Sequence, residues 1–187
     1  GPAMAALYAM RAVKELGIPV TKNCRLILGS DEESGMGDIV HYYSVEPEAP
    51  MTFSPDSSFP VTNVEKGHFR VKLSASFEPS DEGAVLCELY SGDTINIVPG
   101  RAYAIVRGLD DDLIRKEAEK AEKETGVSFS ISATAEGLRI DAEGQGAHAA
   151  HPDDGKNAAL ALLHLVNLLP LGDCAQTRLL KELEKLF

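Results

Sequence analysis

The sequence has 187 residues, 44% of them hydrophobic and 25% charged, which is the composition of a globular protein with one or two domains. Its formal net charge of −11 and its scattered Lys and Arg residues argue against binding to the phosphates of nucleic acids. The longest apolar run, residues 158–169, is too short to cross a bilayer, and the first residues do not resemble a signal peptide. We therefore expect a cytoplasmic protein with reduced cysteines.

The first part of the chain is predicted to alternate helices and strands. Apolar residues recur at helical spacing over residues 3–16, between Pro2 and Gly17, which are typical neighbours of a helix start and a helix end. The predicted elements are helices over residues 3–16 and 36–45 and strands over residues 24–29, 51–54 and 59–64. This order predicts a layered α/β segment whose functional residues lie at strand ends.

The pattern changes near Gly67, where we place the boundary between a first domain, residues 1–66, and a second domain, residues 67–187. The second is predicted as an α+β sandwich, in which one antiparallel sheet carries two helices on one face. Its predicted strands are residues 68–77, 84–90, 94–107 (kinked at Pro99-Gly100), 127–134 and 137–143, and its helices are residues 110–125 and 156–169. The first of these helices is expected to face water and the second to be buried. The leucines of residues 171–187 are expected to lack cover.

Three successive carboxylates, Asp31-Glu32-Glu33, directly follow the strand predicted over residues 24–29. Carboxylates this close repel one another unless cations or hydrogen-bond donors neutralise them. One could ligate a metal ion while its neighbour faces the bound water, which favours a hydrolytic site. The same residues also fit a solvated acidic loop, and the local sequence leaves both interpretations open.

Asp56 is the second candidate, because it lies between Pro55 and Ser57 with Phe53 and Phe59 on either side. This setting predicts a rigid, partly desolvated carboxylate. The alternative is an Asx-turn that only reverses the chain.

His148 is the third candidate, in a Gly-rich segment that runs from Gly144 to Gly155. The G-x-G-x-x-A pattern there suggests a dinucleotide fingerprint, but the delayed helix and the missing acidic residue argue against one. We interpret His148 as a mobile donor to an anionic intermediate, with a structural role as the alternative. His151 and His164 are interpreted as structural.

Six segments together carry a resemblance to a known family. They are Gly1-Pro2-Ala3-Met4-Ala5-Ala6, Gly29-Ser30-Asp31-Glu32-Glu33-Ser34-Gly35, Phe53-Ser54-Pro55-Asp56 with Phe59-Pro60-Val61, Glu65-Lys66-Gly67, Asn96-Ile97-Val98-Pro99, and Gly146-Ala147-His148-Ala149-Ala150 with Pro152, Gly155 and Asn157. Their order and spacing resemble the dinuclear-zinc peptidases of peptidase family M20. The form S-P-D-x-x-F-P-V followed by E-K-G is similar to the PepV-like dipeptidases in particular.

The resemblance implies a role for each candidate residue. Glu32 would be the general base, and Glu33 and Asp56 would ligate the two zinc ions of the intact enzyme, with Mn²⁺ or Co²⁺ as alternative ions. His148 would donate a hydrogen bond to the tetrahedral oxyanion. Asn96 and His148 would contact the substrate, which is expected to be a small peptide.

The resemblance further implies an internal fragment, with residues 1–66 from a catalytic domain and residues 67–187 from the first half of a ferredoxin-like lid. Other metal ligands would lie outside these residues, so the chain is expected to be inactive as it stands. It is expected to self-associate through the edge of the lid sheet and to bind neither nucleic acid nor membrane. The alternatives are an N-acyl amino acid deacylase of the same fold and a non-catalytic lid or assembly domain.

Overall fold

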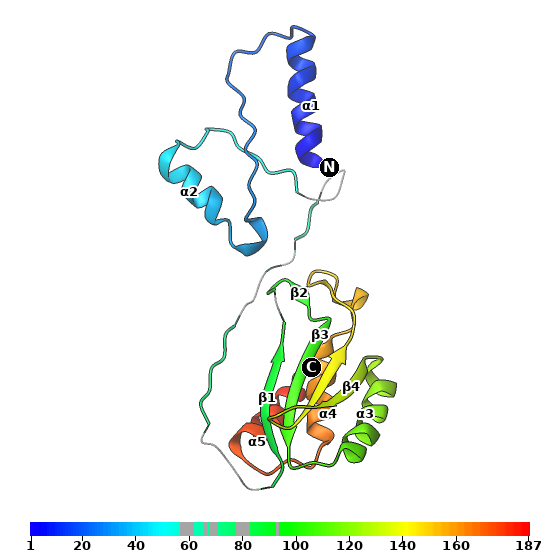
Figure 1. The fold of residues 1–187 in the computed structure, drawn as a ribbon. Coiled ribbons are helices and arrows are strands. Elements are labelled where there is room, and N and C mark those ends of the chain that lie inside the picture. Colours follow the sequence, from blue (N-terminus) through cyan, green and yellow to red (C-terminus); the bar gives the residue numbers. More distant parts are fainter. Residues whose placement is uncertain (57–61, 66, 68–70, 78–82, 93) are drawn as a thin grey trace. The chain divides into compact units, whose positions relative to one another are not determined.

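The computed structural model describes residues 1–56, 62–65, 67, 71–77, 83–92 and 94–187. The chain forms two compact units, Gly1–Lys72 and Leu73–Phe187, and each is described by itself (Figure 1). The domain boundary expected after residue 66 stays a prediction.

The described residues of the first unit form two α-helices, α1 (Pro2–Glu15) and α2 (Gly37–Val45), with the short 3-10 helix η1 (Glu32–Ser34) before α2. Both predicted helices are therefore confirmed. Pro2 occupies the first turn of α1, and Gly17 follows its end with a φ of +63°, a backbone conformation that favours glycine.

The strands predicted over residues 24–29 and 51–54 are wrong, because both segments run without pairing to another strand. Residues 62–64 and 71–77 likewise lie in no strand, while residues 57–61 and 68–70 fall outside the described residues. A strand persists only where its N–H and C=O groups pair with a neighbouring strand. Among the described residues, no strand pairs with any of these segments, so an apolar or alternating pattern alone does not produce a strand.

The second unit is built on an antiparallel sheet of four strands in the order β1-β3-β5-β4. The strands are β1 (Val85–Ser91), β3 (Arg101–Arg107), β4 (Ser128–Ala133) and β5 (Leu138–Glu143). A separate two-stranded ladder joins β2 (Ile97–Val98) to β6 (Ala147–His148). The β4–β5 hairpin is confirmed, and the single strand predicted over residues 94–107 divides at Pro99-Gly100 into β2 and β3.

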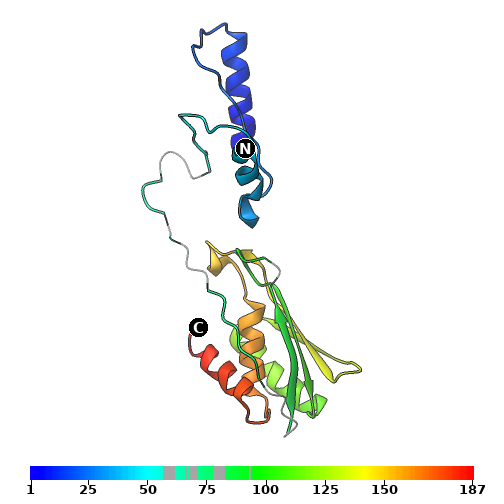
Figure 2. The ribbon, with the colours of Figure 1, turned by 90° about the vertical axis from the view of Figure 1, so that its left-hand side faces the viewer.

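The helices of this unit, α3 (Asp111–Thr125), α4 (Ala158–Leu168) and α5 (Ala175–Glu184), lie on one side of the sheet (Figure 2). The Asp110 carboxylate caps the N-terminus of α3, where it accepts a hydrogen bond from the Asp112 amide at 2.9 Å. The Asn157 side chain caps the N-terminus of α4, where it accepts hydrogen bonds from the amides of Ala159 (3.0 Å) and Leu160 (3.1 Å). Both predicted helices are confirmed, and their starts are set by side chains that satisfy the first free N–H groups.

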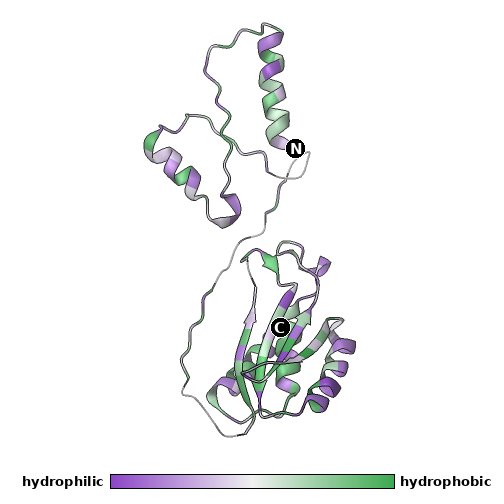
Figure 3. Cartoon of the chain, viewed as in Figure 1, coloured by the Kyte–Doolittle hydropathy of each residue, from purple (hydrophilic) through white to green (hydrophobic). Residues whose placement is uncertain are grey.

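The core lies between the sheet and α4, with α3 and α5 closing its sides. Its buried members include Leu86, Ala104, Val106, Ile114, Ala118, Ala121, Ile140, Ala142, Ala161, Leu162, Leu165 and Val166. The expectation that residues 110–125 simply face water is therefore incomplete. The solvent-exposed face of α3 is mostly hydrophilic (Figure 3), while Ile114, Ala118 and Ala121 on its other face are buried.

Helix α5 corrects the expectation that the leucines of residues 171–187 lack cover. Leu180 packs against the core, and Leu183 is half-buried. Leu179 and Leu186 match the expectation, with 39% and 72% of their surfaces exposed. The partly buried leucines are shielded from water because α5 packs against α4.

Candidate active site

The acidic turn of the first unit is held by one of its own carboxylates. Asp31 precedes η1, its carbonyl accepts from the Met36 amide at 2.7 Å, and its side chain accepts from the Gly37 amide at 2.7 Å. Glu32 and Glu33 follow within η1 and are both exposed. The turn thus uses Asp31 for its own structure and presents the two glutamates at the surface.

Asp38 supports this turn and was not singled out by the sequence interpretation. Its carboxylate accepts from the backbone amides of Ser30 (2.5 Å), Ile39 (2.8 Å) and Asp31 (3.2 Å). These hydrogen bonds, that from Ser30 above all, hold the pKa of Asp38 below its usual value. The signal that could have revealed it is an Asp in the first turn of a predicted helix, where a carboxylate satisfies free amides.

Asp56 lies outside the helices and strands, and its side chain is exposed, which does not match the predicted partly desolvated carboxylate. Its amide donates to the carbonyl of Ser54 at 3.1 Å, so the chain bends at Pro55. The Phe59 expected to flank it lies outside the described residues.

The ladder between β2 and β6 brings Asn96 and His148 together. Ile97 pairs with His148 and Val98 with Ala147, and the Ala149 amide donates to the carbonyl of Asn96 at 2.7 Å. The two residues expected to contact the substrate are therefore neighbours across this ladder, although they are far apart in the sequence. His148 is exposed beside a half-buried Asn96.

The imidazole of His148 is oriented by the backbone that follows it. The Ala150 amide donates to Nδ1 of His148 at 3.1 Å, so Nδ1 must carry a lone pair. In the neutral ring the proton then resides on Nε2, which makes Nε2 the hydrogen-bond donor.

The loop that carries His148 is closed at its base by hydrogen bonds, and the interpretation of His148 as a mobile donor stays a prediction. Gln145 and Lys156 exchange backbone hydrogen bonds of 2.9 and 2.8 Å, and the Gln145 side chain donates to the carbonyl of Asp154 at 3.0 Å. A Cβ added to Gly144 would collide with the carbonyl oxygen of Lys156, so the close approach requires glycine there. The loop is thus hydrogen-bonded to β2 through the β2–β6 ladder, and the hydrogen bonds between Gln145 and Lys156 close it on itself.

The structure gives contacts for the other two histidines, and their structural interpretation stays a prediction. The His151 amide donates to the carbonyl of His148 at 2.9 Å, and the residue precedes the short helix η2 (Pro152–Asp154). His164 lies on α4 between two carboxylates, away from the His148 loop in the sequence.

The described residues contain only part of the ligand set that a zinc centre needs. Glu33 and Asp56 supply oxygen donors that suit zinc, but a catalytic zinc usually has three protein ligands. Within the described ranges, no group of three or more His, Cys, Asp or Glu side chains is arranged to hold a metal ion. The described residues therefore do not fit a zinc centre by themselves.

Glu32, Glu33 and Asp56 belong to the first unit, while Asn96 and His148 belong to the second. Their expected roles stay predictions. None of the helices in the described ranges is long and apolar enough to pass through a membrane.

Known relatives of the chain are named as dipeptidases, which gives the class of protein to which it is similar. The chain is 32% identical over 178 residues to "Putative dipeptidase YtjP" of Bacillus subtilis (strain 168), a match that covers 94% of this chain and 38% of that protein. It is 34% identical over 164 residues to the Beta-Ala-Xaa dipeptidase of Lactobacillus delbrueckii subsp. lactis, covering 87% of this chain and 34% of that protein. The chain thus spans little more than a third of these relatives. No protein-family model matches it.

Proposed function

We propose that the chain is part of a metal-dependent dipeptidase that hydrolyses the peptide bond of small peptides. The observation that carries the proposal is its similarity, along nearly its whole length, to proteins named as dipeptidases. One of these names specifies β-Ala-Xaa peptides, which makes dipeptides with an N-terminal β-alanine the first substrates to test. The relatives' names favour this function over the deacylase alternative.

The exposed glutamates of the acidic turn would act in the first unit. Glu32 would accept the proton of the attacking water, a role that needs a carboxylate within hydrogen-bond reach of that water. Glu33 and Asp56 would be two of the ligands of a two-zinc centre in the intact enzyme, with Mn²⁺ or Co²⁺ as alternatives. Such a centre would supply Lewis-acid polarisation of the scissile carbonyl.

The second unit would supply the groups that recognise the substrate and its oxyanion. The contact from the Ala150 amide to Nδ1 of His148 supports a ring that donates through Nε2–H. Donation to the developing oxyanion lowers the barrier, and loss of one such donor typically costs ~3–4 kcal/mol. Asn96, joined to the same loop through its carbonyl, would contact the substrate beside His148.

The proposed organisation is a catalytic-domain segment, residues 1–66, followed by the first half of a ferredoxin-like lid, residues 67–187. The antiparallel order β1-β3-β5-β4 with helices on one face supports the lid proposal. The cytoplasmic location stays a prediction.

The 187-residue chain by itself is expected to show no dipeptidase turnover and only weak zinc binding, because its described residues do not complete a ligand set. The test is hydrolysis of β-Ala-Xaa, Xaa-Ala and Xaa-His dipeptides with added Zn²⁺, Mn²⁺ or Co²⁺, together with calorimetric titration of zinc. The Glu32→Gln chain serves as the background control. Turnover above that control, or tight stoichiometric zinc binding, would contradict the proposal of an incomplete site.

The chain is also expected to self-associate at micromolar concentration through an edge of its sheet. β1 and β4 are the outer strands, and the outer side of such a strand presents N–H and C=O groups that can pair with another copy. Sedimentation velocity over a concentration series measures this association. A Ser130→Lys change, which adds charge to β4, should weaken association through that edge. A monomer at every concentration would show that both edges are protected.

A further inference from the structure

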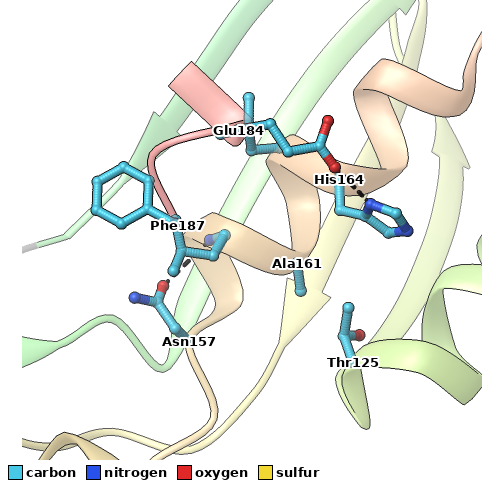
Figure 4. Close-up of a pocket in the computed structure, with 8 residues that line it drawn as sticks. Thr125, Asn157, Ala161, His164, Glu184 and Phe187 are labelled. Atoms are coloured by element: carbon cyan, nitrogen blue, oxygen red, sulfur yellow. Dashed lines mark hydrogen bonds and ion pairs between the residues drawn. The ribbon is translucent and has the colours of Figure 1, made fainter. Parts of the chain in front are cut away.

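His164 on α4 lies between one carboxylate from α3 and one from α5. Its Nδ1 is 2.6 Å from Oε1 of Glu184, and its Nε2 is 2.7 Å from Oε2 of Glu124. Figure 4 shows the contact between the ring and Glu184. Both ring nitrogens are thus within hydrogen-bond distance of a carboxylate oxygen.

This geometry favours a charged ring. A carboxylate only accepts hydrogen bonds, whereas a neutral imidazole has one N–H donor and one lone pair. A neutral His164 could therefore donate to only one of the two glutamates, and its lone pair would face the other at a repulsive distance. The imidazolium form donates to both, and hydrogen bonds between two charged groups are about twice as strong as neutral ones.

The surroundings of the ring agree with this assignment. In the part of the chain that the structure describes, the charged groups that act on His164 are Glu184 from α5 and Glu124 from α3. The strands on the other side of α4 contribute apolar side chains such as Val106 and Ile140. The hydrogen bond to Glu184, assisted by that to Glu124, raises the pKa of His164 above 6.5 against the opposing effect of partial burial.

Glu184 is the point where the last turn of α5 is attached to α4. Its Oε2 accepts from Nδ2 of Asn167 at 2.7 Å, and Nδ2 also lies 3.2 Å from the carbonyl of Leu180. Beside this contact lies a hollow of about 300 Å³, whose lining includes Leu160 and Ala161 of α4 together with Glu184 and Phe187. The position of the last turn of α5 therefore sets the shape of the hollow (Figure 4).

We propose that the His164 imidazolium is a pH-sensitive clamp that joins α3, α4 and α5, and that loss of its proton weakens the attachment of the last turn of α5, which borders this hollow. The direction of the pH dependence of stability follows from the raised pKa of His164 in the folded state. The stabilisation is fully present below the pKa of the unfolded chain and is lost as the pH rises through the pKa of the folded chain. The clamp is independent of the proposed dipeptidase function.

The test compares Glu184→Gln with the unchanged chain by NMR titration of the His164 ring, assigned from the signals lost in His164→Gln. A Gln at residue 184 can accept from Asn167 and donate to Nδ1 of a neutral His164, so it keeps the hydrogen bonds and removes the charge. The titration midpoint of His164 should fall in Glu184→Gln. It should stay unchanged in Glu182→Gln, which removes an exposed carboxylate from the same helix.

The second readout is the melting temperature of the full chain between pH 6 and pH 9. Relative to Glu182→Gln, the Glu184→Gln chain should lose less stability as the pH rises, and hydrogen exchange at residues 180–187 should depend less on pH. Glu124→Gln should shift the midpoint in the same direction. An equal midpoint in the unchanged chain and in Glu184→Gln, or a His164 ring with one unprotonated nitrogen at pH 6, would overturn the proposal.

Discussion

Replacing Glu32 with Gln in the intact enzyme is expected to lower kcat by ~10²–10⁴-fold while metal content stays unchanged. The substitution keeps the size of the side chain and removes the group that would accept the proton from water. The turn itself should survive, because its hydrogen bonds come from Asp31 and Asp38. The measurements are steady-state kinetics with a β-Ala-Xaa dipeptide and metal analysis of the purified protein.

The matched controls are Glu33→Gln and Asp56→Asn, which should lose metal together with activity if these residues are ligands. Comparing kcat and metal content in the three variants therefore distinguishes the general base from the metal ligands. A Glu32→Gln enzyme with near-normal kcat would show that the assignment of the two glutamates is wrong. A Glu33→Gln enzyme with full metal content would remove that residue from the ligand set.

Replacing Leu162 with Ala is expected to destabilise the second unit by about 2–5 kcal/mol. Leu162 is fully buried on α4, and it belongs to the cluster that joins the helices to β3 and β5. The change removes buried apolar surface and leaves a cavity that the surrounding side chains fill only in part. Amide hydrogen exchange in β3 and β5, followed with increasing urea, measures the loss in this unit.

Leu179→Ala is the control, because 39% of the Leu179 surface is already exposed on α5. Its expected cost is less than about 1 kcal/mol, as is usual for surface positions. Equal losses in the two variants would mean that α4 does not occupy the centre of the core.

Elements with local start and end signals were predicted from the sequence. The helix of residues 2–15 has Pro2 and Gly17, and α3 has Asp110 and Gly126; the structure adds Asn157 as the start of α4. Each signal acts on backbone groups within a few residues, so the sequence around it contains the cause. The β4–β5 hairpin is local in the same sense, since its strands are joined by a short turn at Gly137.

Strands without a local partner were not predictable in this way. Residues 24–29 and 71–77 have apolar or alternating patterns similar to those of β1, yet only β1 forms a strand. The difference is the presence of β3 beside β1, which satisfies the backbone groups along one side. Side-chain pattern decides which face of a strand is buried, but pairing decides whether the strand exists.

The sequence by itself determined the candidate residues, since Glu32, Asp56 and His148 were selected by residue type and motif. The tertiary structure alone decided which of them meet. It placed Asn96 beside His148, assigned the donor nitrogen of that ring, and put His164 between Glu124 and Glu184. These contacts join residues far apart in the chain, and their hydrogen bonds depend on distances that only packing of the sheet and helices sets.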